Sequence, residues 1–192
     1  MKEAVVNKWI RDAYAINTAN GFHDPEHPHT NECRLMLIVT EISEAVEADR
    51  KGRVLDKKAF ELFDFLDKDF ADQRYWEQRG FANMFSNTVK DTKEDELADI
   101  VIRCCDFLGC IHEKYAFVPD HYPNGFYDTF ADKGWDWSQI LFDVSRPVVE
   151  RVRILIDDVC WYCENNGIDI AKHVEWKLRY NKTRPFRHGK TY

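Results

Sequence analysis

Two stretches of the chain repeat apolar residues with the period of an α-helix, and this periodicity constrains the fold more than any other feature. In residues 31–51 the apolar positions form one stripe on a helical wheel: Leu35, Ile38, Val39, Ile42, Ala45 and Val46. Residues 92–115 form a second stripe: Leu97, Ile100, Val101, Cys104, Phe107, Leu108 and Ile111. No segment shows sustained alternation of apolar and polar residues, so we expect packed helices and almost no sheet.

The other segments also favour helices, separated by loops rich in glycine and proline. Further helices are expected at about residues 2–17, 56–79, 138–165 and 169–183. Pro147 should begin a new helix or kink the one that contains it. Loops or connectors are expected at residues 21–30, 81–91 and 118–137. The sequence therefore predicts an all-α bundle of about five to six helices.

The length and composition are those of one folded domain. The chain has 192 residues, 44% hydrophobic and 32% charged, so we expect a single domain over residues 1–192. The longest apolar run, residues 35–39, is far too short to cross a bilayer, and the first residues lack the apolar core of a secretory signal. We therefore expect a cytoplasmic protein with no membrane partner, whose six cysteines are free thiols.

Charge is distributed unevenly along the chain. Residues 172–192 contain seven of the 27 lysines and arginines and one of the 34 acidic residues, so the rest of the chain is strongly acidic. An acidic body is poorly suited to binding a nucleic-acid backbone. The pattern suits a small polyanion held between metal ions and a few cationic side chains, and we expect no nucleic-acid partner.

Two pairs of carboxylates lie beside the two apolar stripes. Glu41 and Glu44 flank the first stripe and Glu96 and Asp99 flank the second, each pair at i and i+3. If the stripes pack together, the four carboxylates converge, and their repulsion and lost hydration are unfavourable unless a cation or bound protons compensate. Oxygen ligands without histidine or cysteine favour Mg²⁺ or Mn²⁺. The alternative is that each pair belongs to a solvated helix face.

Histidine-based metal sites are not expected. A di-iron bundle would need Glu-x-x-His on its helices, and the chain has this motif only at residues 26–29, in a loop with two prolines. His23, His27 and His29 lie in the same loop, where Pro25 and Pro28 make a pre-organised three-histidine site improbable.

The string Glu41-Ile-Ser-Glu44, followed by Glu96-Leu-Ala-Asp99, resembles the E-x-x-E…E-x-x-D signature of the MazG-like all-α nucleotide pyrophosphohydrolases. Residues 35–50, 95–106 and 177–190 are similar to the segments that surround these motifs and end the chain in that family. The resemblance implies a Mg²⁺-dependent enzyme that hydrolyses a nucleoside triphosphate to the monophosphate and pyrophosphate. It also implies a homodimer or homotetramer.

The resemblance also implies roles for individual residues. Glu41, Glu44, Glu96 and Asp99 would be the metal ligands, and either a ligand glutamate such as Glu41 or Glu44, or Glu47, would accept the proton of the attacking water. The residues expected to bind substrate are at the C-terminus: Lys177, Asn181, Lys182, Arg184, His188 and Lys190. The alternative is a basic helix that only complements its own dipole.

The sequence departs from the compact members of this family in the length between the two motifs. Residues 54–90 are rich in aromatic side chains and are expected to form a helical insert. The insert could be a lid, a base-stacking wall, a dimerisation arm or an accessory helix over the core. Two alternatives to the main function stay open. One is a dUTPase-like or phosphoribosyl-ATP-type specificity in the same superfamily, and the other is a non-catalytic helical binding module.

Overall fold

The structure, a computed structural model, describes residues 2–26, 28–70, 76–119 and 121–186. Over these residues it contains eight α-helices, one π-helical turn and no strand, which confirms the all-α prediction. The elements are α1 (Glu3–Ala19), α2 (Asn31–Arg50), α3 (Lys57–Asp69), η1 (Trp76–Gly80), α4 (Phe81–Thr88), α5 (Lys93–Cys110), α6 (Phe130–Phe142), α7 (Val148–Asn165) and α8 (Ile170–Lys182). None of the described helices combines the length and the apolar character that a membrane span needs.

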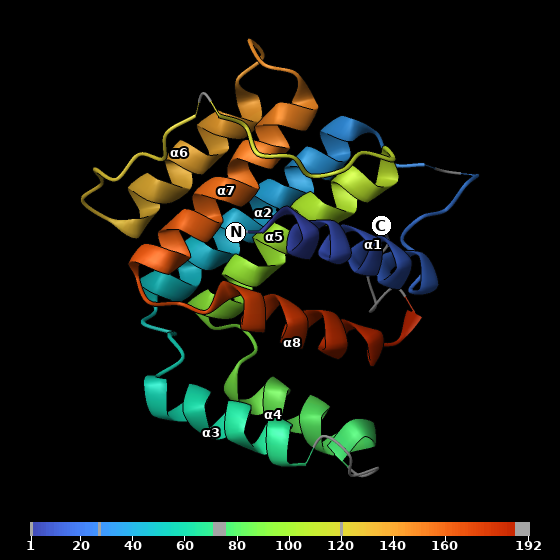
Figure 1. The fold of residues 1–192 in the computed structure, drawn as a ribbon, viewed down its shortest axis with the longest axis vertical. Helices are drawn as coiled ribbons and strands as arrows, with labels where there is room; N and C mark the ends of the chain where they lie inside the picture. Colours follow the sequence, from blue (N-terminus) through green and yellow to red (C-terminus); the bar gives the residue numbers. More distant parts are fainter. Residues whose placement is uncertain (1, 27, 71–75, 120, 187–192) are drawn as a thin grey trace.

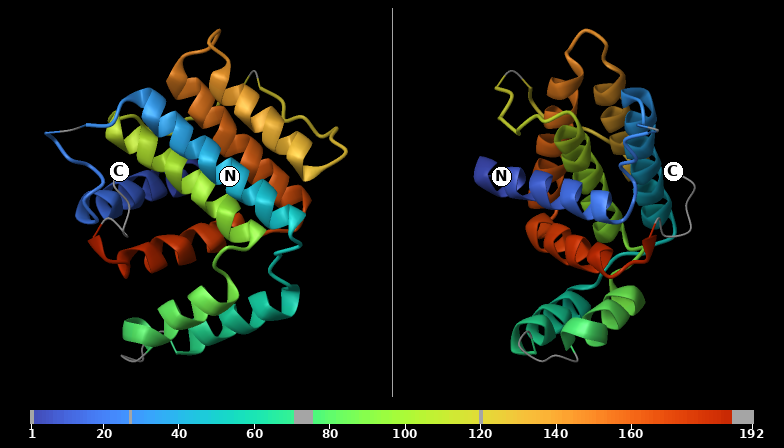
Figure 2. Two further views of the ribbon diagram at one scale, coloured as in Figure 1. Left: turned by 180° about the vertical axis from the view of Figure 1, so that it is seen from behind. Right: turned by 90° about the vertical axis from the view of Figure 1, so that its right-hand side faces the viewer.

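Helix α5 is the centre of the bundle. It contacts α1, α2, α7 and α8, and its residues are buried on almost every side. The left view of Figure 2 shows α2 and α5 lying side by side, with α6 and α7 beyond α2. Ile38 and Ile42 of α2 belong to the same core as Leu97 and Val101 of α5. The two apolar stripes therefore pack in one core, which is the condition under which the carboxylates beside them can converge.

The predicted number of five to six helices is too low. Residues 81–88, expected as part of a connector, form α4, and α6 begins at Phe130, inside the expected loop 118–137. Gly134 was read as a loop residue, but it lies within α6, where a Cβ atom would come 2.7 Å from Cγ2 of Val46 on α2. This glycine allows two helices to approach closely, so it does not end a helix.

The insert at residues 54–90 is a helical hairpin, α3 and α4, that packs against α8 on the side away from the main bundle (Figure 1). A second, aromatic core joins them, made of Phe63, Trp76, Phe81, Phe85, Val89 and Trp176. Asp67 accepts hydrogen bonds from the indole nitrogens of Trp76 (3.0 Å) and Trp176 (3.1 Å). Arg179 of α8 also pairs with Asp67. The hairpin is thus anchored to α8 by aromatic packing, by the shared carboxylate of Asp67 and by the ion pair between Asp64 and Lys172.

A buried histidine at this junction predicts a pH-dependent stability. His173 is 3% exposed and lies against Phe60 and Trp176. Burial lowers its pKa from 6.5 to about 4, opposed only by the charge of Asp169. The unfolded chain therefore binds a proton below pH 6.5 that the folded chain does not bind until about pH 4. Stability should fall by about 3 kcal/mol as pH drops through this range.

Urea unfolding at about pH 7 and about pH 4 measures this loss in the wild type and in His173→Leu. On acidification, the loss of stability in the variant should be about 3 kcal/mol smaller than the loss in the wild type. The control is His112→Asn, because His112 is exposed and has a φ of 57°, which asparagine tolerates. A His173→Leu variant with the full acid sensitivity of the wild type would contradict the prediction.

Candidate functional site

The packing of α2 against α5 brings three of the predicted metal ligands together. Carboxylate oxygens of Glu41, Glu44 and Glu96 all lie within 4.8 Å of one another. Glu41 and Glu96 are buried, whereas Glu44 is exposed. The i and i+3 spacing in α2 and the flank position of Glu96 in α5 are the local reasons for this convergence.

One carboxylate oxygen of Glu96 has no hydrogen-bond partner among the described residues, although the charge of Lys177 acts on the group. This oxygen, Oε2, is buried. Burial, followed by the charge of Asp99, raises the pKa of Glu96 to about 8. Burial and Asp99 also raise the pKa of Glu41, although Arg103 opposes them. The two buried glutamates are therefore destabilised as anions, and a cation held among them would relieve that cost.

The fourth predicted ligand, Asp99, lies in the same cleft but is shared with a lysine. Its Oδ2 atom is 2.7 Å from Nζ of Lys177, and Oδ2 of Asp95 is 2.6 Å from the same nitrogen. Lys177 is only 4% exposed, and although burial lowers its pKa, the two carboxylates raise it overall. Lys177, expected to bind substrate, thus binds Asp95 and Asp99 and fixes the position of Asp99 at the cleft.

The cleft around these groups has a volume of about 190 Å³. Arg184 and Asn181, two of the residues expected to bind substrate, line it, and Oδ1 of Asn181 has no hydrogen-bond partner among the described residues. Lys182 is exposed and is not among the lining residues. His188 and Lys190 lie outside the described residues.

Glu47 lies beside the cluster of Glu41, Glu44 and Glu96 and is not part of it. It pairs with Lys51 (2.9 Å) and Arg50 (3.2 Å), and the hydrogen bond from Lys51 lowers its pKa. It lines a shallow pocket of about 170 Å³ together with Glu44 and Glu96. As a proton acceptor Glu47 would first have to leave its ion pairs.

The cleft also contains charged residues that the sequence analysis did not single out as site residues. Arg103 donates from Nε to Oε1 of Glu41 at 2.9 Å. It lies four residues after Asp99 on the same flank of α5, and this spacing was the only available signal. Lys90 and Asp91 also line the cleft. Asp91 has a φ of 63°, and its amide donates to Asp95 at 3.1 Å. Lys90 and Asp91 connect α4 to α5, and their place in the cleft depends on how the α3–α4 hairpin packs. Residue spacing in the sequence does not reveal that packing.

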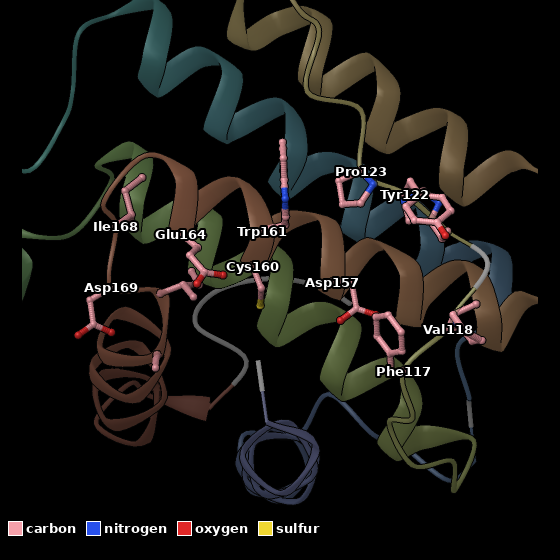
Figure 3. A pocket seen from close by; sticks show the side chains of 14 residues that line it. Phe117, Val118, Tyr122, Pro123, Asp157, Cys160, Trp161, Glu164, Ile168 and Asp169 are labelled. Atoms are coloured by element: carbon pink, nitrogen blue, oxygen red, sulfur yellow. The ribbon is translucent and has the colours of Figure 1, made fainter.

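A larger cavity, about 550 Å³, lies elsewhere, between residues 117–119 and 121–123 and helices α7 and α8 (Figure 3). Its walls are largely apolar and aromatic, with Trp161 and Tyr122 among them. Its acidic residues, Asp157, Glu164 and Asp169, do not form one of the metal-ligand groups found among the described residues. The smaller cleft, where carboxylates and cations meet, is therefore the candidate site.

No family model, no curated protein sequence and no solved structure matches this chain.

Proposed function

We propose that this chain is a MazG-like, Mg²⁺-dependent nucleoside triphosphate pyrophosphohydrolase. It would cleave between the α- and β-phosphates and release the monophosphate and pyrophosphate. The observation that carries the proposal is the convergence of Glu41, Glu44 and Glu96 at the seam of α2 and α5, with one buried oxygen of Glu96 lacking a partner. The motif resemblance supplies the reaction class, and the geometry supports it.

The residues present fit a hard divalent cation. Glu41, Glu44 and Glu96 would hold Mg²⁺, or Mn²⁺ in its place, through carboxylate oxygens, with Asp99 beside them. When bound, such an ion neutralises phosphate oxygens and lowers the pKa of a coordinated water. Glu44 is the exposed member of the group and is the carboxylate best placed to accept a proton from a water in the cleft.

The cationic and amide groups of the cleft would bind the rest of the substrate. Arg184 can bind a phosphate in a bidentate manner and Lys90 can contribute a point charge. The unpartnered Oδ1 of Asn181 offers an acceptor to a ribose hydroxyl or a base amino group. Lys177 would act through Asp99, whose carboxylate it fixes, rather than on the phosphates directly.

A panel of nucleoside and deoxynucleoside triphosphates, with Mg²⁺ or with a chelator, tests the proposal when pyrophosphate and orthophosphate are measured separately. We expect pyrophosphate and monophosphate, formed only with the metal. Release of orthophosphate alone would show that the enzyme does not cleave between the α- and β-phosphates. Including dUTP and phosphoribosyl-ATP distinguishes the two specificities within the superfamily, and no turnover of any substrate would favour a non-catalytic binding module.

The proposed assembly is a homodimer or homotetramer. Light scattering on the purified chain measures its mass in solution. A monomer at the concentration where the enzyme is active would remove this part of the proposal without affecting the reaction.

A further inference from the structure

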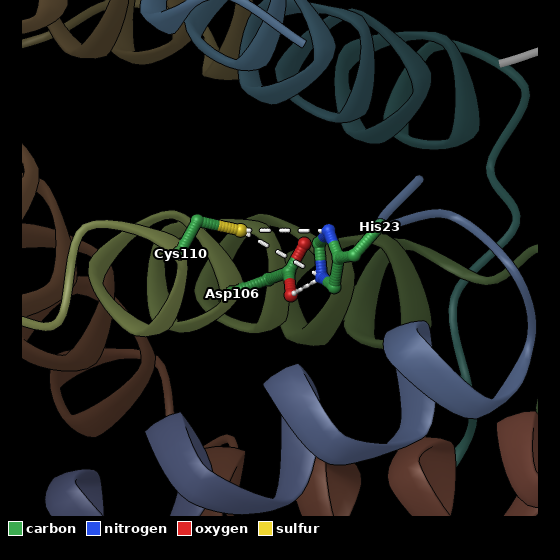
Figure 4. A group of neighbouring side chains, drawn as sticks. All are labelled: His23, Asp106 and Cys110. Carbon is green, nitrogen blue, oxygen red and sulfur yellow. Dashed lines mark hydrogen bonds and ion pairs between the residues drawn. The ribbon is translucent and has the colours of Figure 1, made fainter. Parts of the chain in front are cut away.

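A second group of metal-ligating side chains lies outside the carboxylate site. His23, Asp106 and Cys110 each direct a ligand atom toward the same point, and these atoms lie within 4.8 Å of one another (Figure 4). Nε2 of His23 is 2.9 Å from Oδ1 of Asp106, and Sγ of Cys110 is 3.6 Å from both imidazole nitrogens. All three side chains are largely or partly buried, so the group is held by the fold and is not a chance surface contact.

Three elements position this group. Asp106 and Cys110 are i and i+4 on α5 and share one face, while His23 follows the end of α1. Tyr14 of α1 stacks on the imidazole, with ring centroids 5.0 Å apart and an interplanar angle of 19°. Gly109 allows this approach, because a Cβ atom there would lie 2.7 Å from Cβ of Tyr14. The imidazole is therefore oriented on one face by a ring and at its edge by the carboxylate.

We propose that His23, Asp106 and Cys110 form a transition-metal site with the ligand preference of Zn²⁺. A nitrogen, a thiolate and a carboxylate suit Zn²⁺, which in three-ligand sites takes a water as the fourth ligand. Mg²⁺ does not favour a thiolate or an imidazole, so this group and the carboxylate cleft select different ions. The proposal does not depend on the proposed hydrolase activity.

The spacing of the ligand atoms agrees with a tetrahedral ion. Zn–N of about 2.0–2.1 Å and Zn–S of about 2.3 Å place nitrogen and sulfur about 3.6 Å apart at the tetrahedral angle. The observed separation of Cys110 Sγ from the His23 nitrogens is 3.6 Å. The contact between His23 and Asp106, 2.9 Å here, would have to lengthen by about 0.4 Å to make room for the metal. Because Sγ is equally far from Nδ1 and Nε2, the imidazole would also have to turn so that one nitrogen lone pair points between the thiolate and the carboxylate.

The location gives the site a structural role. Phe22, next to His23, lines the carboxylate cleft, and Arg103 lies one helical turn before Asp106 on α5. A bound ion would tie the connection between α1 and α2 to the central helix, beside the wall of the cleft. In the metal-free chain, burial lowers the pKa of His23, but the hydrogen bonds with Asp106 and Cys110 outweigh it and raise the pKa to about 9. The alternative to a metal site is therefore a plain imidazolium–carboxylate pair next to a thiol.

Cobalt substitution distinguishes the two. The full chain is stripped with a chelator and titrated with Co²⁺, which gives a thiolate-to-metal charge-transfer absorption only when a cysteine is bound. We expect this absorption with one Co²⁺ per chain and its displacement by Zn²⁺. Cys110→Ser should remove the absorption, and zinc affinity should fall by more than about 100-fold, since loss of an outer partner alone costs 10–100-fold.

The controls use other residues of the same kind. Cys33→Ser should keep the absorption, because Cys33 is the other half-buried thiol and lies on α2, outside the group. Glu96→Gln should also keep it, which separates this site from the carboxylate cleft. His23→Gln provides a second loss-of-binding variant in a connection rather than a helix, should Cys110→Ser fold poorly. A wild-type chain without thiolate absorption, or an absorption that survives both Cys110→Ser and His23→Gln, would overturn the proposal.

Discussion

Replacing Glu41 and Glu96 together with glutamine is expected to lower kcat/KM for triphosphate hydrolysis by at least about 1,000-fold. This corresponds to about 4 kcal/mol of transition-state stabilisation, within the range that a catalytic metal ion supplies. Glutamine keeps the shape of each side chain but removes the negative charge that would bind the ion. Steady-state rates of pyrophosphate release over a range of Mg²⁺ concentrations measure the effect.

Thermal melting separates lost metal binding from lost folding. In the wild type, Mg²⁺ at about ten times its dissociation constant should add about 1.4 kcal/mol, a rise in Tm of about 3–5 °C for a chain of this size. The double variant should show no such rise. Glu96→Gln alone removes a buried carboxylate with an unpartnered oxygen and leaves the pair of Glu41 and Arg103 intact, so this single variant should be at least as stable as the metal-free wild type. Glu32→Gln, an exposed glutamate in the first turn of α2, should keep both activity and the Mg²⁺ response. Activity of the double variant within tenfold of the wild type would argue against the site.

The parts of the fold that could be predicted are those that depend on local periodicity. The predicted ends of α2 and α5 lie within one residue of the observed ends, except that α5 ends at Cys110 and not at Tyr115. The agreement arises because an apolar stripe and a polar flank are recorded directly in the sequence. A capping threonine is likewise a local signal, and the side chain of Thr92 accepts a hydrogen bond from the amide of Asp95 at the start of α5. Gly134 was misread because a glycine selected for close helix packing looks the same in a sequence as one that ends a helix.

The part of the candidate site that could be predicted is the set of residues that share one flank of a helix. The positions of Glu41, Glu44 and Glu96 follow from their spacing along the helices. The ion-pair partners of the cationic side chains, such as Lys177, do not follow from spacing. Lys177 lies in a basic segment, and periodicity alone does not tell whether its ammonium group faces solvent or two carboxylates of α5. The pairing depends on the packing of α8 against α5, which is a long-range contact.

The role of the insert was left open by its sequence for the same reason. Aromatic residues at helical spacing are compatible with a lid, an arm or a covering helix. The structure joins the hairpin to α8 through Asp67 and the aromatic core, and the chain then leads through Lys90 and Asp91 into the cleft. The insert thus covers α8 and also supplies a wall of the candidate site.

Replacing Lys177 with methionine is expected to destabilise the protein by about 3–5 kcal/mol, the usual cost of removing one partner of a buried ion pair. Methionine preserves most of the length of the side chain but leaves Asp95, which is 1% exposed, without its cation. Burial already raises the pKa of Asp95 to about 6 although Lys177 opposes that rise. Urea unfolding near neutral pH measures the loss of stability.

Two further variants show whether the loss comes from the unpaired charge. Adding Asp95→Asn to Lys177→Met should recover about 1–3 kcal/mol, because the neutral amide no longer needs a buried cation. Lys172→Met is the matched control, since Lys172 lies on the same helix but pairs with Asp64 at a more exposed position, and it should cost less than about 1 kcal/mol. If Lys177→Met costs no more than Lys172→Met, the buried pair does not stabilise α8 against α5, and Lys177 would instead be available to the substrate.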